Sequence, residues 1–186
     1  LHDALPQGGR SLVVGKSTVP VGTAQQVAER VAGRALVLWN PEFLREGFAV
    51  ADTLHPDRIV YGVPTDPADA QEAQAVLDAV YQDLLEEGIP RIVTDYPTAE
   101  LVKTAANSFL ATKISFINAM AHLCDTAGAD VTVLADAIGH DPRIGRRFLQ
   151  AGVGFGGGCL PKDIRALQAS ADLHGAVHLA DLLGRV

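Results

Sequence analysis

The first half of the chain alternates short apolar runs with amphipathic segments. Runs of four or five mostly apolar residues predict β-strands at residues 11–15, 35–39, 58–62 and 91–94. Between them, apolar positions recur at helical spacing in residues 23–31 and 66–87, and Asp66-Pro67 is a typical start for the second helix. Strands that alternate with helices predict an α/β fold with a parallel sheet and crossover helices.

From about Pro97 onward the strand pattern disappears. Apolar residues keep a helical period through residues 97–127, which predicts one helix longer than those of ordinary globular domains. A helix of this length is typical of an interdomain spine or a dimer interface. Two shorter helices are expected at residues 131–138 and 161–173, and the boundary between the two halves falls near Tyr96.

Composition limits the classes of function. The 186 residues are 48% hydrophobic and 20% charged, which is ordinary for a globular protein, and no apolar run is long enough for a membrane span. A net charge of −7 argues against a general nucleic-acid or membrane-surface binder. Cys124 and Cys159 form no disulfide framework and indicate a reducing compartment, so we expect a cytoplasmic protein. Because the only methionine is Met120, we expect a part of a longer protein.

A glycine-rich loop at residues 152–158 contains the spacing GxGxxG. In a dinucleotide-binding site this spacing follows a strand and opens a helix, whereas residues 146–151 are not strand-like. The loop is either a flexible connection or a segment whose backbone lies close to a ligand.

Cys159 directly follows this loop and precedes the predicted helix. Amide groups at a helix start, together with Lys162, favour a thiolate nucleophile. Asp163 lies one helical turn further on, where it could order a water molecule or accept a proton. The alternative is a small buried cysteine beside a carboxylate at a helix start. Cys124, inside the long apolar helix, is expected in the core.

Lys103 and Asn107 are four residues apart in the long helix and therefore project from one face. A lysine and an amide in an apolar helix could stabilise a developing alkoxide. The alternative is a solvated stripe that also includes Glu100.

Glu42 and Glu46 follow the strand at residues 35–39, and Thr18 follows the strand at residues 11–15. In an open parallel sheet, ligands bind at the carboxyl ends of the strands, where these residues would lie. The alternative for the two glutamates is a helix capped by Asn40 with acidic residues in its first turn.

Positive charge gathers before the glycine-rich loop, at Arg143, Arg146 and Arg147. In an acidic chain this suits an anionic ligand such as a diphosphate, or else marks a solvated basic helix end. The six histidines are scattered and none lies at a metal-ligand spacing, so we expect no metal.

Taken together, four blocks of the sequence resemble the UDP-glucose/GDP-mannose dehydrogenase family. They occur in the family's order at residues 16–22 (KSTVPVG), 40–47 (NPEFLREG), 103–107 (KTAAN) and 154–163 (GFGGGCLPKD). The resemblance covers nearly the whole chain, and the cysteine block is highly specific. It implies a C-terminal portion of a Rossmann-like NAD-binding domain at residues 1–96 and a helical central domain for dimerisation and catalysis at residues 97–186.

The resemblance also implies a reaction. Members of the family oxidise the C6 alcohol of a nucleotide sugar to a carboxylate and use NAD twice. By resemblance, Cys159 would trap the C6 aldehyde as a thiohemiacetal, which a second oxidation converts to a thioester. Lys103 and Asn107 would stabilise the oxyanion at C6, and Asp163 would manage protons with Thr18 and a water molecule.

Further roles follow from the same matching positions. Glu42 would assist thioester hydrolysis, and Thr18 and Glu46 would lie near the nicotinamide end of NAD. Arg143 would reach the ligand from the partner subunit of a homodimer built on the central helix. The other expected contacts to the nucleotide sugar are Phe43, Leu44, Lys103, Asn107, Phe148, Phe155 and Gly156.

The resemblance leaves alternatives open. Residues 54–58 (LHPDR) and 143–145 (RIG) favour UDP-glucose over GDP-mannose or another nucleotide sugar as substrate. The family's GxGxxG segment would precede Leu1 and a second Rossmann-like domain would follow Val186, so we do not expect the chain to be active alone. A non-catalytic dimerisation or binding module of the same ancestry is the second hypothesis. The 3-hydroxyacid dehydrogenases, which combine similar domains without the cysteine, are the third.

Overall fold

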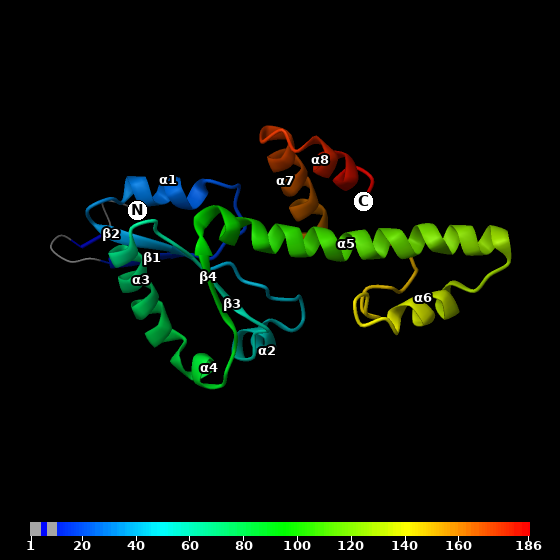
Figure 1. Ribbon diagram of the computed structural model, residues 1–186, viewed down its shortest axis with the longest axis horizontal. Coiled ribbons are helices and arrows are strands. Elements are labelled where there is room, and N and C mark those ends of the chain that lie inside the picture. Colours follow the sequence, from blue (N-terminus) through cyan, green and yellow to red (C-terminus); the bar gives the residue numbers. More distant parts are fainter. Residues whose placement is uncertain (1–4, 7–10) are drawn as a thin grey trace. The chain divides into compact units, whose positions relative to one another are not determined.

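The computed structural model describes residues 5–6 and 11–186 (Figure 1). The chain consists of two compact units. Unit 1 comprises Leu1–Lys103 and unit 2 comprises Thr104–Val186. The division falls inside one helix, α5 (Tyr96–Ala127). Residues 1–4 and 7–10 of the predicted first domain lie outside the described residues.

Four strands of unit 1 form one sheet in which the spatial order is the chain order. They are β1 (Ser11–Gly15), β2 (Ala35–Trp39), β3 (Ile59–Val63) and β4 (Arg91–Asp95). The pairs β1–β2 and β3–β4 are parallel, whereas β2 and β3 are antiparallel and pair at Trp39 and Gly62. The predicted strands and the α/β fold class are confirmed, but the sheet is mixed rather than wholly parallel. Between β2 and β3 lies only the short helix α2 (Ala49–Leu54), and antiparallel neighbours need no long crossover helix.

Helices cover both faces of the sheet, as Figure 1 shows for α1 (Thr23–Arg30) and α3 (Pro67–Val80). Side chains of β2 alternate between the two resulting cores because successive residues of a strand point to opposite faces. Val37 and Trp39 pack with α1 and the start of α5, whereas Leu36 and Leu38 pack with α3. This explains why β2 is apolar throughout and buried from Leu36 to Trp39.

The predicted helix over residues 66–87 is interrupted in the structure. Asp66 caps α3 as expected, since its carboxylate accepts hydrogen bonds from the amides of Ala68 and Asp69. The helix ends at Val80, and α4 (Gln82–Glu86) begins after Tyr81, whose φ of −100° and ψ of 17° leave helical geometry. The apolar period continues across this break, so the pattern alone does not reveal it.

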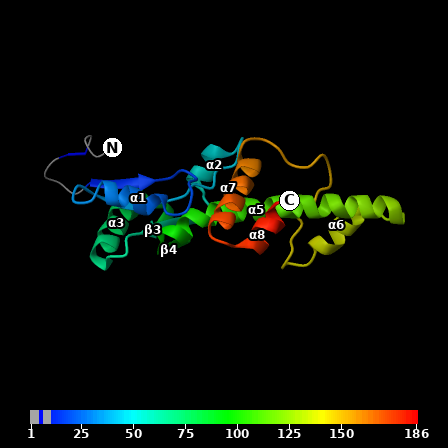
Figure 2. The ribbon, with the colours of Figure 1, turned by 90° about the horizontal axis from the view of Figure 1, so that it is seen from above.

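The described residues of unit 2 form helices and loops but no strand, as predicted for the second half of the chain. Helix α5 is unbroken. The other helices of unit 2 are α6 (Val131–Gly139), α7 (Cys159–Leu173) and α8 (Val177–Leu183). Ile117 of α5 packs with Ala135 of α6 and with Leu149 in one cluster. Ala111 of α5 packs with residues of α7 and α8 in another, and Figures 1 and 2 show these two helices side by side.

None of the helices in residues 11–186 combines the length and the apolarity that a membrane crossing requires.

We expect Gly62→Ala to destabilise unit 1 by about 1–3 kcal/mol, because overpacking a core strains it. A Cβ atom at Gly62 would lie 2.6 Å from the Cβ atom of Ala99. The fluorescence of Trp39, the only tryptophan, reports unfolding of this core in a urea titration. Gly152→Ala in unit 2, where a Cβ atom meets nothing within 4 Å, is the control and should leave the Trp39 transition unchanged. A Gly62→Ala chain as stable as the wild type would contradict this packing.

Candidate active site

In unit 1 the loop after β2 places Glu42 against Lys103 of α5. The Lys103 ammonium donates a short hydrogen bond to Oε1 of Glu42, and the Leu44 amide donates to Oε2 at 2.7 Å. Lys103 is only 9% exposed, and the Glu42 side chain is 31% exposed. The pair therefore joins a buried ammonium to a carboxylate that remains partly exposed to solvent.

The pKa of Glu42 is lowered from its ordinary value of 4.5. Burial on its own would raise the pKa of Glu42, but the hydrogen bonds from Lys103 and Leu44 and the positive charges of Lys103 and Lys16 outweigh it. Glu42 is therefore an ionised carboxylate near neutral pH.

Asn40 is 2% exposed and binds three groups from separate parts of unit 1. Its Oδ1 accepts hydrogen bonds from the Lys16 ammonium and the Tyr81 hydroxyl, both at 2.7 Å. Its Nδ2 donates to the carbonyl of Val60 at 2.9 Å. The hypothesis that Asn40 caps a helix is wrong, because residues 40–45 form no helix and α2 begins only at Ala49.

Glu100, a residue of α5, is 3% exposed, and its carboxylate lies at the start of α1. Its Oε2 accepts from the amide of Gly22 at 2.7 Å, and its Oε1 accepts from the amide of Ala24 at 2.6 Å. The interpretation of Glu100, Lys103 and Asn107 as a solvated stripe is therefore wrong for the first two, which are buried, and Asn107 is half-buried. No local pattern in the sequence indicates a carboxylate that caps a helix 76 residues away.

The remaining predicted residues of unit 1 lie in the loops after β1 and β2. Thr18 is half-buried in the loop that follows β1, and Glu46 is exposed. The ring of Phe43 faces the guanidinium of Arg58 at 4.0 Å, and Leu44 is 43% exposed. Because β1 and β2 are parallel neighbours, both loops lie at the carboxyl edge of the sheet.

In unit 2, Cys159 is the first residue of α7 and is exposed. The helix starts two residues earlier than predicted, so Pro161 lies within its first turn and Asp163 follows Cys159 by one turn. The alternative of a buried structural cysteine is wrong for Cys159, whereas Cys124 is 3% exposed in the core, as expected.

Asp163 is buried, since it is only 1% exposed. Its two carboxylate oxygens have different surroundings. Its Oδ2 accepts a hydrogen bond from Nδ2 of Asn107 at 2.7 Å. Its Oδ1 has no hydrogen-bond partner among the described residues, and the Lys162 ammonium lies 3.7 Å from it. Asn107 thus fixes the carboxylate, while the buried Oδ1 keeps an unused capacity to accept a hydrogen bond. Asp163 lies in the second turn of α7 and is buried.

The loop at residues 152–158 follows no strand in the described structure, which agrees with the sequence argument against a dinucleotide fingerprint. Gly154 and Gly157 have φ of 95° and 76°, in the left-handed region that favours glycine. Phe155 packs against the cluster of α5, α7 and α8, and Gly156 is exposed. Phe148 has φ of 66°, the only non-glycine residue with positive φ in the described chain. Such strain concentrates at ligand sites.

Two of the three arginines before this loop already pair with carboxylates. Arg143, whose side chain is 87% exposed, contacts Asp141 at 2.5 Å, and Arg146 forms a short ion pair with Asp136. Arg147 is exposed. Arg143 is therefore accessible to an anionic ligand, whereas Arg146 is occupied with holding α6 to the segment that follows it.

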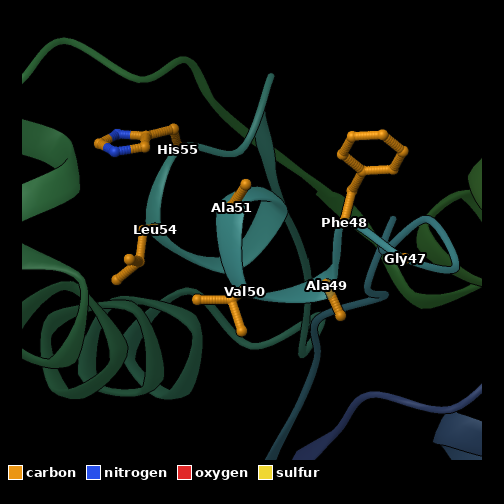
Figure 3. Close-up of a pocket in the computed structure, with 7 residues that line it drawn as sticks. All are labelled: Gly47, Phe48, Ala49, Val50, Ala51, Leu54 and His55. Carbon is orange, nitrogen blue, oxygen red and sulfur yellow. The ribbon is translucent and has the colours of Figure 1, made fainter.

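A surface hollow of about 630 Å³ lies around α2 and is lined mainly by apolar side chains such as Phe48, Val50 and Leu54 (Figure 3). None of the residues expected to act in catalysis lines it. Within residues 5–6 and 11–186, no group of three or more His, Cys, Asp or Glu side chains could hold a metal ion.

Comparison with known proteins assigns both parts of the chain. Residues 3–85 match the NAD binding domain of the UDP-glucose/GDP-mannose dehydrogenase family, and residues 97–184 match its central domain. A UDP-glucose 6-dehydrogenase of Rickettsia typhi is 52% identical over 159 residues, which cover 84% of this chain and 36% of that protein. The chain therefore spans just over a third of that relative.

Solved structures agree with this assignment. A UDP-glucose dehydrogenase from Pyrobaculum islandicum is 42% identical with a TM-score of 0.81, and the match covers 95% of this chain and 41% of that one. A GDP-mannose dehydrogenase from Pseudomonas aeruginosa is 28% identical with a TM-score of 0.65, and the match covers 98% and 42%. From the two matched domains and these relatives, the chain belongs to the UDP-glucose/GDP-mannose dehydrogenase family.

Proposed function

We propose that this chain is the catalytic portion of an NAD-dependent enzyme that oxidises UDP-glucose to UDP-glucuronate. In this proposal residues 1–96 are the end of the NAD-binding domain and residues 97–186 are the central domain. The observation that carries it is the geometry of unit 2, an exposed Cys159 at a helix start one turn before the buried Asp163. Because the chain spans about a third of its relatives, we expect turnover only in the longer protein.

Cys159 is the proposed nucleophile. Its thiolate adds to the C6 aldehyde, the carbonyl oxygen takes a proton, and a thiohemiacetal holds the reactive aldehyde until the second oxidation gives a thioester. Exposure of Cys159 supports this role, because a sugar can reach the sulfur atom. Asp163, oriented by Asn107, accepts or returns the proton with Thr18 and a water molecule through Oδ1, which has no hydrogen-bond partner among the described residues.

Lys103 and Glu42 are proposed to serve the same reaction. The Lys103 ammonium stabilises negative charge on the C6 oxygen, together with the amide of Asn107. Glu42, whose pKa is lowered, is ionised near neutral pH and can take a proton from the water molecule that hydrolyses the thioester. That water cleaves the bond from carbon to sulfur, which releases the acid and restores the thiol.

The described residues fit the nicotinamide end of NAD. The loops that carry Thr18 and Glu46 follow two parallel neighbouring strands, and cofactors of open α/β sheets bind at such carboxyl ends. When bound, NAD accepts the hydride in each oxidation. The loop at residues 152–158 follows no strand in the described structure and is not proposed as the site of the NAD diphosphate.

Phe43, Leu44, Phe148, Phe155 and Gly156 are proposed contacts to the nucleotide sugar. UDP-glucose is the preferred substrate, since the relatives of 42–52% identity include UDP-glucose dehydrogenases and the GDP-mannose enzyme is 28% identical. Both cysteines are free, which supports a reducing compartment such as the cytoplasm.

A homodimer built on α5 completes the proposal, with Arg143 contacting the ligand bound by the partner. Phe109, Phe116 and Leu123 are 66%, 51% and 55% exposed, and their seven-residue spacing puts them on one face of α5. An apolar stripe of this kind on a long helix is typical of a surface that a second chain covers.

Changing Cys159→Ser in the full-length protein should lower uronic acid formation by several orders of magnitude, because covalent catalysis is lost. Binding of UDP-glucose, measured by calorimetry, should change little. Cys124→Ser is the matched control and should reduce stability rather than turnover, since it places a hydroxyl in the core. Near-normal NADH formation by Cys159→Ser would make the nucleophile assignment wrong.

Changing Lys103→Met should raise the pKa of Glu42, because burial is then opposed by fewer donors and less positive charge. The titration of the Glu42 carboxyl carbon by NMR measures this. Since the folded pKa of Glu42 is lowered, its contribution to stability is present above pH 4.5 and is lost as the pH falls through the folded value. Lys113→Met, in the same helix, is the control, and an unchanged Glu42 titration in Lys103→Met would contradict the ion pair.

Changing Phe116→Asp should convert the proposed dimer to a monomer, because a carboxylate in an apolar interface is costly to desolvate. Light scattering after size-exclusion chromatography measures the mass. Leu173→Asp, at an 81% exposed residue of α7, is the control and should leave the mass unchanged. A wild-type chain that is monomeric at micromolar concentration would count against this dimer.

A further inference from the structure

We propose that Tyr81, Asn40 and Glu100 are positioning residues that clamp both ends of residues 16–22, the segment that carries Thr18. The inference rests on the proposed function, because Thr18 matters only if it serves the site. All the groups involved belong to unit 1.

The first end of the segment is held through Lys16. The Lys16 ammonium donates to Oδ1 of Asn40 at 2.7 Å and to the hydroxyl of Tyr81 at 2.9 Å. The Tyr81 hydroxyl in turn donates to the same Oδ1, which closes a triangle of three polar groups. The side-chain amide of Asn40 donates to the Val60 carbonyl, and the backbone amide of Asn40 donates to the carbonyl of Gly15 at 2.7 Å. Lys16 is therefore tied to the sheet itself.

The other end is held through Gly22. Its amide and that of Ala24 donate to the two oxygens of the buried Glu100 carboxylate. Gly22 itself has φ of 94° and contributes no side chain to cap α1. The Glu100 carboxylate thus fixes the point at which the segment leads into α1.

Between the two ends, residues 16–22 form neither helix nor strand, so regular backbone hydrogen bonding does not set the place of Thr18. A short irregular segment fixed at both ends has few conformations left, which lowers the entropy cost of aligning a reactive group. The same anchors adjoin the proposed catalytic pair, since Asn40 lies two residues before Glu42 and Glu100 lies one turn before Lys103. The Tyr81 hydroxyl forms its hydrogen bonds with Asn40 and Lys16, so Tyr81 acts on the segment through these two residues.

Two variants test the clamp in this chain by hydrogen exchange. Tyr81→Phe removes the hydroxyl and keeps the half-buried ring, and Glu100→Gln keeps the shape but removes the charge. Amide exchange in residues 16–24 should rise about tenfold in either variant, the effect of losing roughly one hydrogen bond from a local structure. Tyr96→Phe and Glu29→Gln are the matched controls. The Tyr96 hydroxyl donates to the Val37 carbonyl of β2, and Glu29 is exposed on α1.

Kinetics of the full-length protein separate positioning from stability. Tyr81→Phe should lower kcat about tenfold while KM for UDP-glucose changes less than twofold, whereas Tyr96→Phe should lose stability and keep kcat. Unchanged exchange in residues 16–24 of both variants would overturn the clamp. Raised exchange with a kcat equal to that of Tyr96→Phe would overturn the positioning role. A wild-type protein inactive on UDP-glucose would refute the proposed function, and the exchange data would still decide the clamp.

Discussion

The carboxylate of Glu100 replaces the N-terminal cap that α1 lacks. Helix α1 begins after Gly22, which has no side chain to satisfy the first amides, and buried amides without partners are costly. Glu100 supplies both oxygens from the start of α5. Because the carboxylate is buried, its desolvation must be offset by these charge-assisted bonds and by the positive end of the α1 dipole. The contact therefore joins the first turns of α5 to the start of α1.

Two further carboxylates follow the same physical rule in different ways. Glu42 is held ionised by Lys103 and the Leu44 amide, which help to outweigh the effect of burial on its pKa. Asp163 receives a hydrogen bond on one oxygen, from Asn107, and its other oxygen has only the Lys162 ammonium at 3.7 Å. Lys103 and Asn107, which lie in the same helix, thus each bind a carboxylate from another part of the chain, Glu42 and Asp163 respectively. Both acids come from segments that the family resemblance had already marked, although no spacing in the sequence joins them to these partners.

The spacing of apolar residues predicted the elements whose burial follows one regular pattern along the chain. The strand β2 is buried on both faces and reads as a continuous apolar run, and the long helix α5 was expected within one residue of its start. Periodicity failed where distant side chains decide the conformation. The break at Tyr81 coincides with a hydroxyl bonded to Asn40, and the antiparallel step from β2 to β3 depends on pairing between separate segments. Neither leaves a mark on local apolar spacing.

The candidate site was predictable in its membership but not in its contacts. Cys124 and Cys159 look alike as isolated thiols, and what distinguishes them is the surrounding sequence, an apolar helix for one and a glycine loop before a helix for the other. The structure places the first in the core and the second at the surface. The roles of Asn40 and Glu100 could not be found this way, because each depends on partners that only the fold brings near.

Unit 2 violates local rules of stability at two places that flank the glycine-rich loop. Phe148 adopts a left-handed backbone conformation that a non-glycine residue enters at a cost, and Oδ1 of Asp163 is buried without a hydrogen-bond partner in the described structure. A chain selected for stability alone would favour glycine at the first position and a fully satisfied or apolar side chain at the second. Natural proteins depart from such rules chiefly at functional sites. Both departures lie within eleven residues of Cys159, whereas the ion pairs of Arg143 and Arg146 before the loop obey the rules. The unsatisfied oxygen and the strained residue therefore favour ligand chemistry at the start of α7 independently of any resemblance in sequence.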